Sequence, residues 1–348
     1  MTAPFRLYGA ETSPYALKLR SYLRFKQLPF EWVSRSQARV EEFSRYAKLP
    51  LAPVLVDAEE TVLQDTTPTI EKLEEAFPEP SIVPDDPALA FLACLIEDYA
   101  DEWLSKAMFH YRWSRPEDQE GAAKRIADML YEGAEAPEGV LESIRTRMAS
   151  RLHHVGSSPE TAAMIEGSFT RLLDILERQL AARSYLLGGR PSIADFGLAA
   201  QFAQLLADPT PGALIKTRAP RVAMWVDRME SPDIEGSFAG FDALRDDLAQ
   251  LLREEIAGAY LTWMAANARA VADDLPGVSI EIAGVTFSQK PQRYAAKALA
   301  ALRAKRGALA GNEALNALLA ETGCETFLAL ASADHDGEDG EGDGDDED

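Results

Sequence analysis

The chain has 348 residues, 47% of them hydrophobic, which is enough to bury a sizeable core and to form two or three domains. Its formal net charge is −22, and more than half of that charge remains when the last fifteen residues, with their ten acids, are set aside. Such an acidic surface repels phosphate backbones, so we expect no nucleic-acid partner. No apolar run approaches the ~20 residues that a membrane span requires, so we expect no membrane association either.

The N-terminus leads almost directly into a predicted strand. It has no basic segment followed by an apolar one, so we expect no secretory signal. The two cysteines, Cys94 and Cys324, lie in no CxxC motif and cannot make a disulfide scaffold. These features predict a cytoplasmic protein.

Residues 5–9 alternate between two faces, as β-strands do. Ser13-Pro14 then predicts the start of a helix, because Ser is a favoured N-cap and Pro at the first helical position loses no hydrogen bond. Apolar residues continue at helical spacing as far as Leu23. A hydroxyl at the positive end of a helix suits an anion, although a plain N-cap serine would give the same local pattern.

The next fifty residues complete a compact α/β unit. We predict a strand at 30–34, a short helix or irregular segment at 37–47, a hairpin from 51–57 and 61–64, and a helix from Asp65-Thr66-Thr67-Pro68 to Ala76. The resulting order is βαβαββα.

Residues 86–232 are predicted to be entirely helical. The Ser192-x-x-Asp195 pair is a capping box that begins an apolar helix, which supports the fold and says nothing of chemistry. The predicted helical stretches are 89–113, 145–155, 159–187, the segment after Ser192, and 219–232.

Residues 238–333 are predicted to form a small α+β extension that folds back on the helices. It contains helices at 244–273, 294–306 and 312–320, and a hairpin at 278–288 that turns at Ala283-Gly284. The acidic residues 334–348 are predicted to be disordered. An alternating set of acids there resembles a calcium loop, but position six is Asp339 instead of Gly and no helix pair flanks it, so we expect no EF-hand.

Three motifs in this order resemble the thioredoxin-like N-terminal domain of glutathione transferases. SPYALKLR (13–20) resembles the active-site segment of bacterial members, LAPVLVD (51–57) the strand whose proline is cis, and DTTPTIEKLEEAFP (65–78) the helix that follows. GGRPSIAD (188–195) and residues 219–232 resemble signatures of the family's helical domain. The resemblance covers residues 4–232. It implies a glutathione-binding domain at 1–80 and an all-helical domain at 86–235 that lines an electrophile pocket, followed by the extension at 238–333 and the tail at 334–348.

The resemblance also implies roles for individual residues. Ser13 matches the catalytic position that stabilises the glutathione thiolate. The backbone of Ala52, before cis-Pro53, would pair with the cysteinyl part of glutathione. Asp65 and Thr66 would hold its γ-glutamyl ammonium and carboxylate, although Asp-Thr-Thr-Pro is also a good helix cap on its own.

The electrophile pocket is predicted from weaker signals. Tyr8 ends the first strand, and Tyr99, Trp103 and His110 lie on the helix that corresponds to the pocket wall in the family. An aromatic stripe at helical spacing is more often core than substrate pocket. Lys18 is expected to be solvated or to face a dimer partner.

The sequence therefore predicts an enzyme that uses glutathione as cosubstrate and adds its thiolate to a small hydrophobic electrophile. Serine in place of cysteine argues against mixed-disulfide chemistry. The histidines have no ligand spacing, so we expect no metal. The alternative is a non-catalytic glutathione-binding or protein-interaction module on the same fold, which the extension and the acidic tail favour. A homodimer is expected from the resemblance alone.

Overall fold

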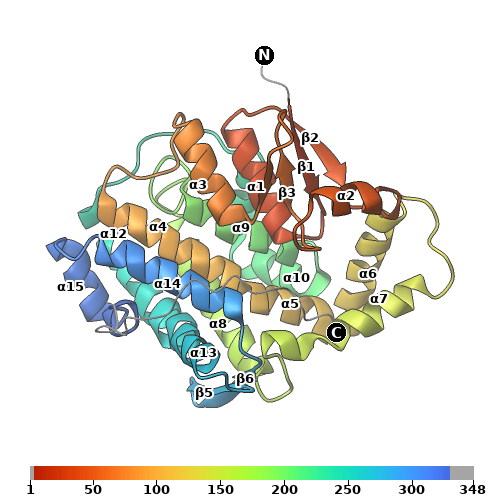
Figure 1. Ribbon diagram of the computed structural model, residues 1–348. Coiled ribbons are helices and arrows are strands. Elements are labelled where there is room, and N and C mark those ends of the chain that lie inside the picture. Colours follow the sequence, from red (N-terminus) through yellow and green to blue (C-terminus); the bar gives the residue numbers. More distant parts are fainter. Residues whose placement is uncertain (1–3, 330–348) are drawn as a thin grey trace.

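The structure is a computed structural model, and it describes residues 4–329. The predicted acidic tail, residues 334–348, lies outside this range. The described N-terminal elements form the predicted βαβαββα order (Figure 1). They are β1 (Phe5–Gly9), α1 (Pro14–Phe25), β2 (Phe30–Ser34), a 3-10 turn (Gln37–Arg39), α2 (Val40–Tyr46), β3 (Val54–Val56), β4 (Val62–Gln64) and α3 (Thr66–Ala76).

The four strands form one mixed sheet in the order β2-β1-β3-β4. β1 pairs parallel with β2 and antiparallel with β3, and β3 pairs antiparallel with β4 as the predicted hairpin. Helix α1 begins as predicted, with Ser13 as N-cap and Pro14 in the first turn. Leu19, Tyr22 and Leu23 are buried in one apolar core with Leu7 of β1 and Leu55 of β3, which fixes α1 beside the sheet.

The middle of the chain is helical, as predicted. Its central helix α9 begins at the predicted capping box, because the Ser192 and Asp195 side chains each bond the other's backbone amide. Two helices, α6 and α10, lie outside the predicted helical stretches. The elements are α4 (Pro87–Tyr99), the π-helical segment η2 (Ala100–Leu104), α5 (Ser105–Ser114), α6 (Pro116–Leu130), α7 (Val140–Ala149), a 3-10 turn (Leu152–Val155), α8 (Ala162–Gln179), α9 (Ile193–Leu206), α10 (Pro209–Arg218) and α11 (Pro220–Met229).

The last part of the described chain is the predicted α+β extension. Its hairpin turns at Ala283 and Gly284, which both have positive φ, as a two-residue turn between twisted strands requires. The elements are α12 (Phe241–Leu251), the π-helical segment η4 (Leu252–Leu261), α13 (Thr262–Ala272), β5 (Val278–Ile282), β6 (Val285–Gln289), α14 (Arg293–Gly307), α15 (Glu313–Thr322) and α16 (Glu325–Leu328). The predicted fold class is therefore confirmed for the described residues.

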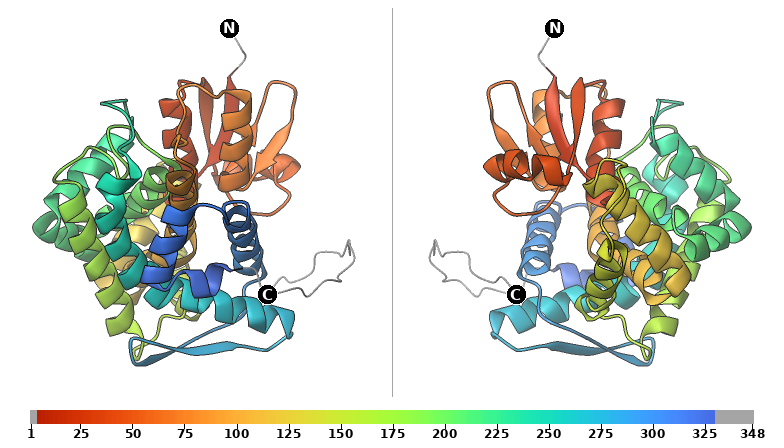
Figure 2. Two further views of the ribbon diagram at one scale, coloured as in Figure 1. Left: turned by 90° about the vertical axis from the view of Figure 1, so that its left-hand side faces the viewer. Right: turned by 90° about the vertical axis from the view of Figure 1, so that its right-hand side faces the viewer.

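The extension is packed into the same core as the rest of the molecule. One continuous apolar cluster runs from Leu7 in the sheet through Phe196 in α9 to Trp263, Phe287 and Leu318 in the extension. Helix α14 lies alongside α4 and below the N-terminal sheet (Figures 1 and 2). The extension is thus positioned to reach the edge of the N-terminal unit.

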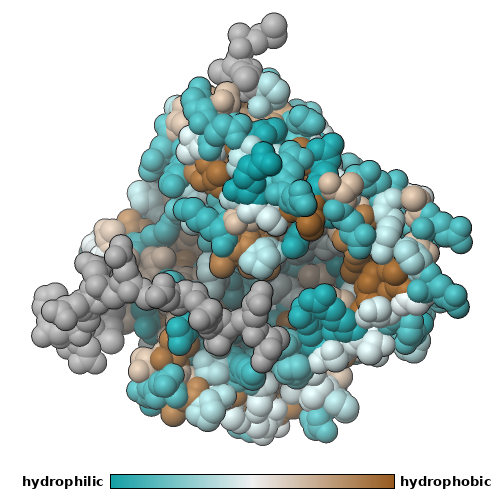
Figure 3. Space-filling model, turned by 45° about the vertical axis from the view of Figure 1, so that its right-hand side comes forward, coloured by the Kyte–Doolittle hydropathy of each residue, from teal (hydrophilic) through white to brown (hydrophobic). Residues whose placement is uncertain are grey.

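The surface is mainly hydrophilic on the face shown in Figure 3, with apolar residues in separate groups. Among the helices of residues 4–329, none combines the length and the apolarity that crossing a bilayer requires.

Candidate active site

The start of α1 carries the first predicted site residue, Ser13. Its hydroxyl oxygen accepts a hydrogen bond from the amide of Ala16 at 3.3 Å, as an N-cap does. Within residues 4–329 the hydroxyl proton has no acceptor. Ser13 can therefore cap its helix and still donate to an anion at the positive end of the helix dipole.

The entry to β3 carries the second predicted feature. The Ala52–Pro53 peptide bond is cis, as the resemblance implies. Neither the amide nor the carbonyl of Ala52 has a hydrogen-bond partner in the described part of the chain. Both groups are therefore available to pair with an extended peptide-like ligand, as one rung of a β-ladder.

The start of α3 carries the third predicted feature, Asp65 and Thr66. Asp65 precedes the helix with a φ of 80°, in the left-handed region that few non-glycine residues adopt. Its carboxylate makes no capping bond to α3 and instead accepts a hydrogen bond from the Tyr294 hydroxyl, at 2.8 Å from Oδ2. Thr66 follows as the first residue of the helix and is buried. The simple capping interpretation of Asp65 is therefore wrong for its side chain.

These separate segments meet at one cavity of about 280 Å³. It brings together four of the predicted residues, Ala52, Pro53, Asp65 and Thr66. Ser13 does not line it, but Tyr15 in the first turn of the same helix does. The described residues that line the cavity are Tyr15, Leu49, Leu51, Ala52, Pro53, Gln64, Asp65, Thr66, Asp101, Glu102 and Tyr294.

One wall of the cavity is acidic and comes from the π-helical segment η2. Burial raises the pKa of Asp101 to about 7, although the Lys18 ammonium opposes this shift. Burial likewise raises the pKa of Glu102 to about 7, against the opposing charge of Lys106. In this wall, burial favours the neutral carboxyl over the charged carboxylate, and the nearby ammonium groups only partly oppose it.

Lys18 behind this wall differs from its prediction, because it is fully buried rather than solvated. Its ammonium donates to Asp101 at 2.7 Å and also to Glu97. Burial disfavours the ammonium charge, but Asp101 and Glu97 outweigh burial and raise the pKa of Lys18 above its usual value. Glu97 and Asp101, one helical turn apart, thus both bind Lys18, a contact that the sequence did not reveal.

The four predicted electrophile-pocket residues lie elsewhere. None of them is among the described residues that line the cavity. Tyr8 is buried in a small apolar cluster on the other face of the sheet, with Val33, Phe43, Val54 and Val56, and its hydroxyl donates to Glu42 at 2.7 Å. Burial and Glu42 raise the pKa of Tyr8. The side chain is thus fixed away from the site.

Tyr99, Trp103 and His110 are core residues of the helical region, so their prediction as a pocket wall is also corrected. The Tyr99 hydroxyl donates to Glu255 at 3.3 Å, and the Trp103 indole donates to Ser168 at 3.1 Å. His110 lies between Ser157 and Glu166, and burial lowers its pKa. All three are at most 4% exposed. The structure thus places all three side chains in the core, which is the alternative assignment of the aromatic stripe.

Sequence reasoning also missed contributors to the cavity. Gln64 orders the loop before β3, because its side-chain amide donates to the carbonyls of Leu49 and Leu51, at 2.8 Å each. The only feature of the sequence that points to Gln64 is its position at the end of the predicted strand 61–64. Nothing in the sequence indicates that Tyr294 reaches the cavity, because it lies in the extension, 229 positions from Asp65.

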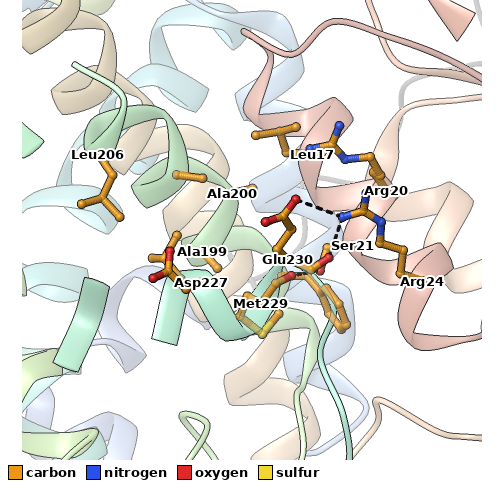
Figure 4. Close-up of a pocket in the computed structure, with 13 residues that line it drawn as sticks. Leu17, Arg20, Ser21, Arg24, Ala199, Ala200, Leu206, Asp227, Met229 and Glu230 are labelled. Atoms are coloured by element: carbon orange, nitrogen blue, oxygen red, sulfur yellow. Dashed lines mark hydrogen bonds and ion pairs between the residues drawn. The ribbon is translucent and has the colours of Figure 1, made fainter. Parts of the chain in front are cut away.

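A second cavity, of about 200 Å³, lies between α1, α9 and α11 (Figure 4). None of the predicted site residues lines it. Two pairs of its lining residues bond each other: Arg24 donates to the Glu230 carbonyl at 2.8 Å, and the Ser21 hydroxyl donates to the Met229 carbonyl. Because it contains none of the predicted site residues, this cavity is a poorer candidate for chemistry than the first.

Comparisons with known proteins agree with the motifs. The family model described as "Glutathione S-transferase, N-terminal domain" matches residues 7–81, and "Glutathione S-transferase, C-terminal domain" matches residues 159–228. The chain is 25% identical over 203 residues to the isoprene-epoxide–glutathione S-transferase of Rhodococcus sp. (strain AD45), covering 54% of this chain and 78% of that protein.

Two solved structures illustrate the similarity. The beta-etherase LigF from Sphingobium sp. strain SYK-6 is 21% identical, with a TM-score of 0.48 over 70% of this chain and 98% of that one. A glutathione S-transferase from Methylobacterium radiotolerans, in complex with glutathione sulfonate, is 23% identical, with a TM-score of 0.44 over 68% of this chain and 97% of that one. The two matched domain models agree with the motifs of α1, β3, α3 and α9, so this chain resembles the glutathione transferase family of enzymes in both its N-terminal and its helical part.

Proposed function

We propose that this protein binds glutathione in the cavity at the start of α3 and adds its thiolate to a small hydrophobic electrophile. The observation that carries the proposal is the meeting of Ala52, Pro53, Asp65 and Thr66 at one cavity beside the first turn of α1. These residues come from two separate segments, and each offers a group that one part of glutathione requires.

In this proposal Asp65 accepts a hydrogen bond from the γ-glutamyl ammonium. The hydroxyl of Thr66 donates to the γ-glutamyl carboxylate. The backbone amides of the first turn of α3, which need no partner within the helix, donate to the same carboxylate. The amide and carbonyl of Ala52 pair with the cysteinyl residue. These contacts direct the sulfur towards Ser13.

Ser13 then lowers the pKa of the bound thiol. A free thiol titrates near ~8.5, and the thiolate is the reactive form. The Ser13 hydroxyl and the positive end of α1 both stabilise the anion, and each pKa unit corresponds to about 1.4 kcal/mol. One charge-assisted hydrogen bond is therefore enough to shift the thiol towards neutral pH.

We propose that the electrophile approaches over Leu49 and Leu51. These side chains line the cavity and remain 59% and 61% exposed, so they offer apolar surface beside the thiolate. Epoxides are the first class to test, because the Rhodococcus relative is named for an epoxide. The thiolate would attack an epoxide carbon, the C–O bond would break, and the alkoxide would take a proton from solvent.

The test is calorimetric titration with glutathione, followed by mass spectrometry of conjugates from a panel of epoxides and aryl halides. Saturable glutathione binding and a product with the summed mass of glutathione and epoxide support the proposal. Binding without any product would favour the alternative, a non-catalytic glutathione-binding module. Absence of binding would reject both.

We also propose a cytoplasmic homodimer. The resemblance to glutathione transferases supports the dimer, and the two free cysteines, Cys94 and Cys324, support a reducing compartment. Size-exclusion chromatography with light scattering tests the dimer, and a mass of one chain at micromolar concentration would contradict it.

A further inference from the structure

We propose that Tyr294, in the C-terminal extension, is a positioning residue for glutathione that acts through Asp65. The inference rests on the function proposed above and adds a residue from outside the two matched domains. It gives the extension a role in the active site.

The contact joins two parts of the chain that are far apart in sequence. Tyr294 is the second residue of α14, and its hydroxyl donates to Oδ2 of Asp65 at 2.8 Å. Both residues line the same cavity. The bond uses one carboxylate oxygen and leaves Oδ1 to accept from an ammonium group, since a carboxylate has about four acceptor sites.

The Tyr294 hydroxyl remains a donor over the working pH range. Tyr294 as a residue is 54% exposed, but its hydroxyl is bonded to Asp65 at the cavity wall. Burial, followed by the charges of Asp65, Glu102 and Asp101, raises the pKa of this phenol well above its usual value. A phenol that stays protonated fixes the orientation of the carboxylate to which it donates.

The orientation of Asp65 needs such support. Its backbone has positive φ, and its carboxylate forms no bond to the helix that follows it. Asp101 and Glu102 line the same cavity, and where they are ionised, above about pH 7, their negative charge repels a third carboxylate. The phenol of Tyr294 offsets this repulsion with a directed hydrogen bond, and so holds Asp65 towards the expected place of the ammonium.

Helix α14 is itself fixed, so it can hold Tyr294 in place. Ala295 and Leu299 are fully buried in the common core. Before the helix, the amide of Gln292 donates to Asn267 at 2.7 Å. Further along α14, Lys305 forms an ion pair with Glu71 of α3, remote from the cavity. Lys305 therefore offers a matched control, because it ties the same two helices without contacting Asp65.

The experiment compares wild-type protein with Tyr294→Phe, Asp65→Asn, their double variant and Lys305→Ala. Glutathione binding is measured by calorimetry. The values of kcat and KM are measured from the conjugation of a reactive electrophile. A second ligand, N-glutaryl-cysteinylglycine, is glutathione without its ammonium. We expect Tyr294→Phe to weaken glutathione binding about five- to twentyfold, with kcat at saturating glutathione little changed. Lys305→Ala should bind like the wild type.

Two further results are expected if Tyr294 acts through Asp65. Tyr294→Phe should cause no additional loss in the Asp65→Asn background, and it should not weaken binding of the ligand without an ammonium. Unchanged or tighter glutathione binding in Tyr294→Phe would overturn the inference, and so would an equal loss in Lys305→Ala. Failure of the wild type to bind glutathione would instead reject the proposed function itself.

Discussion

The ring centroids of Trp103 and Phe287 lie 5.6 Å apart, and they join the helical region to the C-terminal extension. Phe287 comes from β6 and is fully buried. Trp263 of α13 lies on the same side, with its ring centroid 6.3 Å from that of Trp103. The extension thus fills the space beside an aromatic helix that the sequence suggested as an open pocket wall.

This packing predicts that the extension and the helical region unfold together. Phe287→Ala removes a fully buried ring, and we expect it to lower the free energy of unfolding by about 3–5 kcal/mol. The loss should appear in a single urea transition followed by tryptophan fluorescence and by circular dichroism.

Ser288→Ala, on the exposed face of the same strand, is the matched control and should have little effect. Two separate transitions, with only the first affected by Phe287→Ala, would show that the extension is an independent unit.

The second prediction concerns Ser13. Ser13→Ala removes one hydrogen-bond donor to the thiolate. The pKa of the bound glutathione thiol should therefore rise by about one unit, and kcat/KM near neutral pH should fall about tenfold. The measurement is the ultraviolet absorbance of the bound thiolate as a function of pH.

Ser21→Ala, in the same helix, is the control, since Ser21 donates to the Met229 carbonyl on the far side of α1. Ser13→Ala also removes a helix cap, which costs about 1 kcal/mol, so thermal unfolding must show that both variants remain folded. An unchanged thiol pKa in Ser13→Ala would remove Ser13 from the mechanism.

Features that depend on a few neighbouring residues could be predicted from the sequence. Ser13-Pro14 begins α1, the Ala283-Gly284 turn closes the β5–β6 hairpin, and Ser192 with Asp195 caps α9. Each is decided by backbone preferences and hydrogen bonds within about four residues. The family motifs extended this local information to the cis bond before Pro53.

Features that depend on distant partners could not be predicted. From the sequence alone, Lys18 is expected at the surface. Only the packing of the helices brings Glu97 and Asp101 into contact with it. The helical spacing of Trp103 favours the core over a pocket wall, but the sequence does not show that Phe287 of the extension packs against it. Tyr294 joins the site only because the extension folds back below the sheet (Figure 2).

The third prediction concerns Asp195, the buried acid of the capping box. It accepts hydrogen bonds from the amides of Leu186 and Ser192, at 2.8 and 2.9 Å, and from the indole of Trp225 at 3.2 Å. In Asp195→Asn an NH2 group replaces one carboxylate oxygen. This group is a hydrogen-bond donor, and it would face the N–H donors that Asp195 now accepts from. We expect the free energy of unfolding to fall by about 2–4 kcal/mol, measured by urea denaturation.

Asp246→Asn replaces a fully exposed carboxylate and should leave stability unchanged. A loss in Asp195→Asn no larger than that of Asp246→Asn would show that the capping box contributes little to this fold.

The last prediction is a pH dependence of stability that originates at the acidic wall of the cavity. Burial raises the pKa of Asp101 and Glu102 to about 7 in the folded protein, whereas unfolded carboxyls titrate near 4. Between these values the folded state binds more protons than the unfolded state. Stability should therefore fall as the pH rises from 5 to 6.5, by up to about 1.4 kcal/mol per pH unit for each proton.

Glu102→Gln should make this slope shallower, because it removes one of the proton-binding groups. Glu102→Asp keeps a carboxyl and should keep most of the slope. The measurement is urea unfolding of each variant at several pH values below 7, where Lys106, whose pKa burial lowers to about 7, adds little. Stability that rises with pH in this window, or an equal slope in Glu102→Gln, would mean that the acids beside Lys18 and Lys106 are already ionised when the protein is folded.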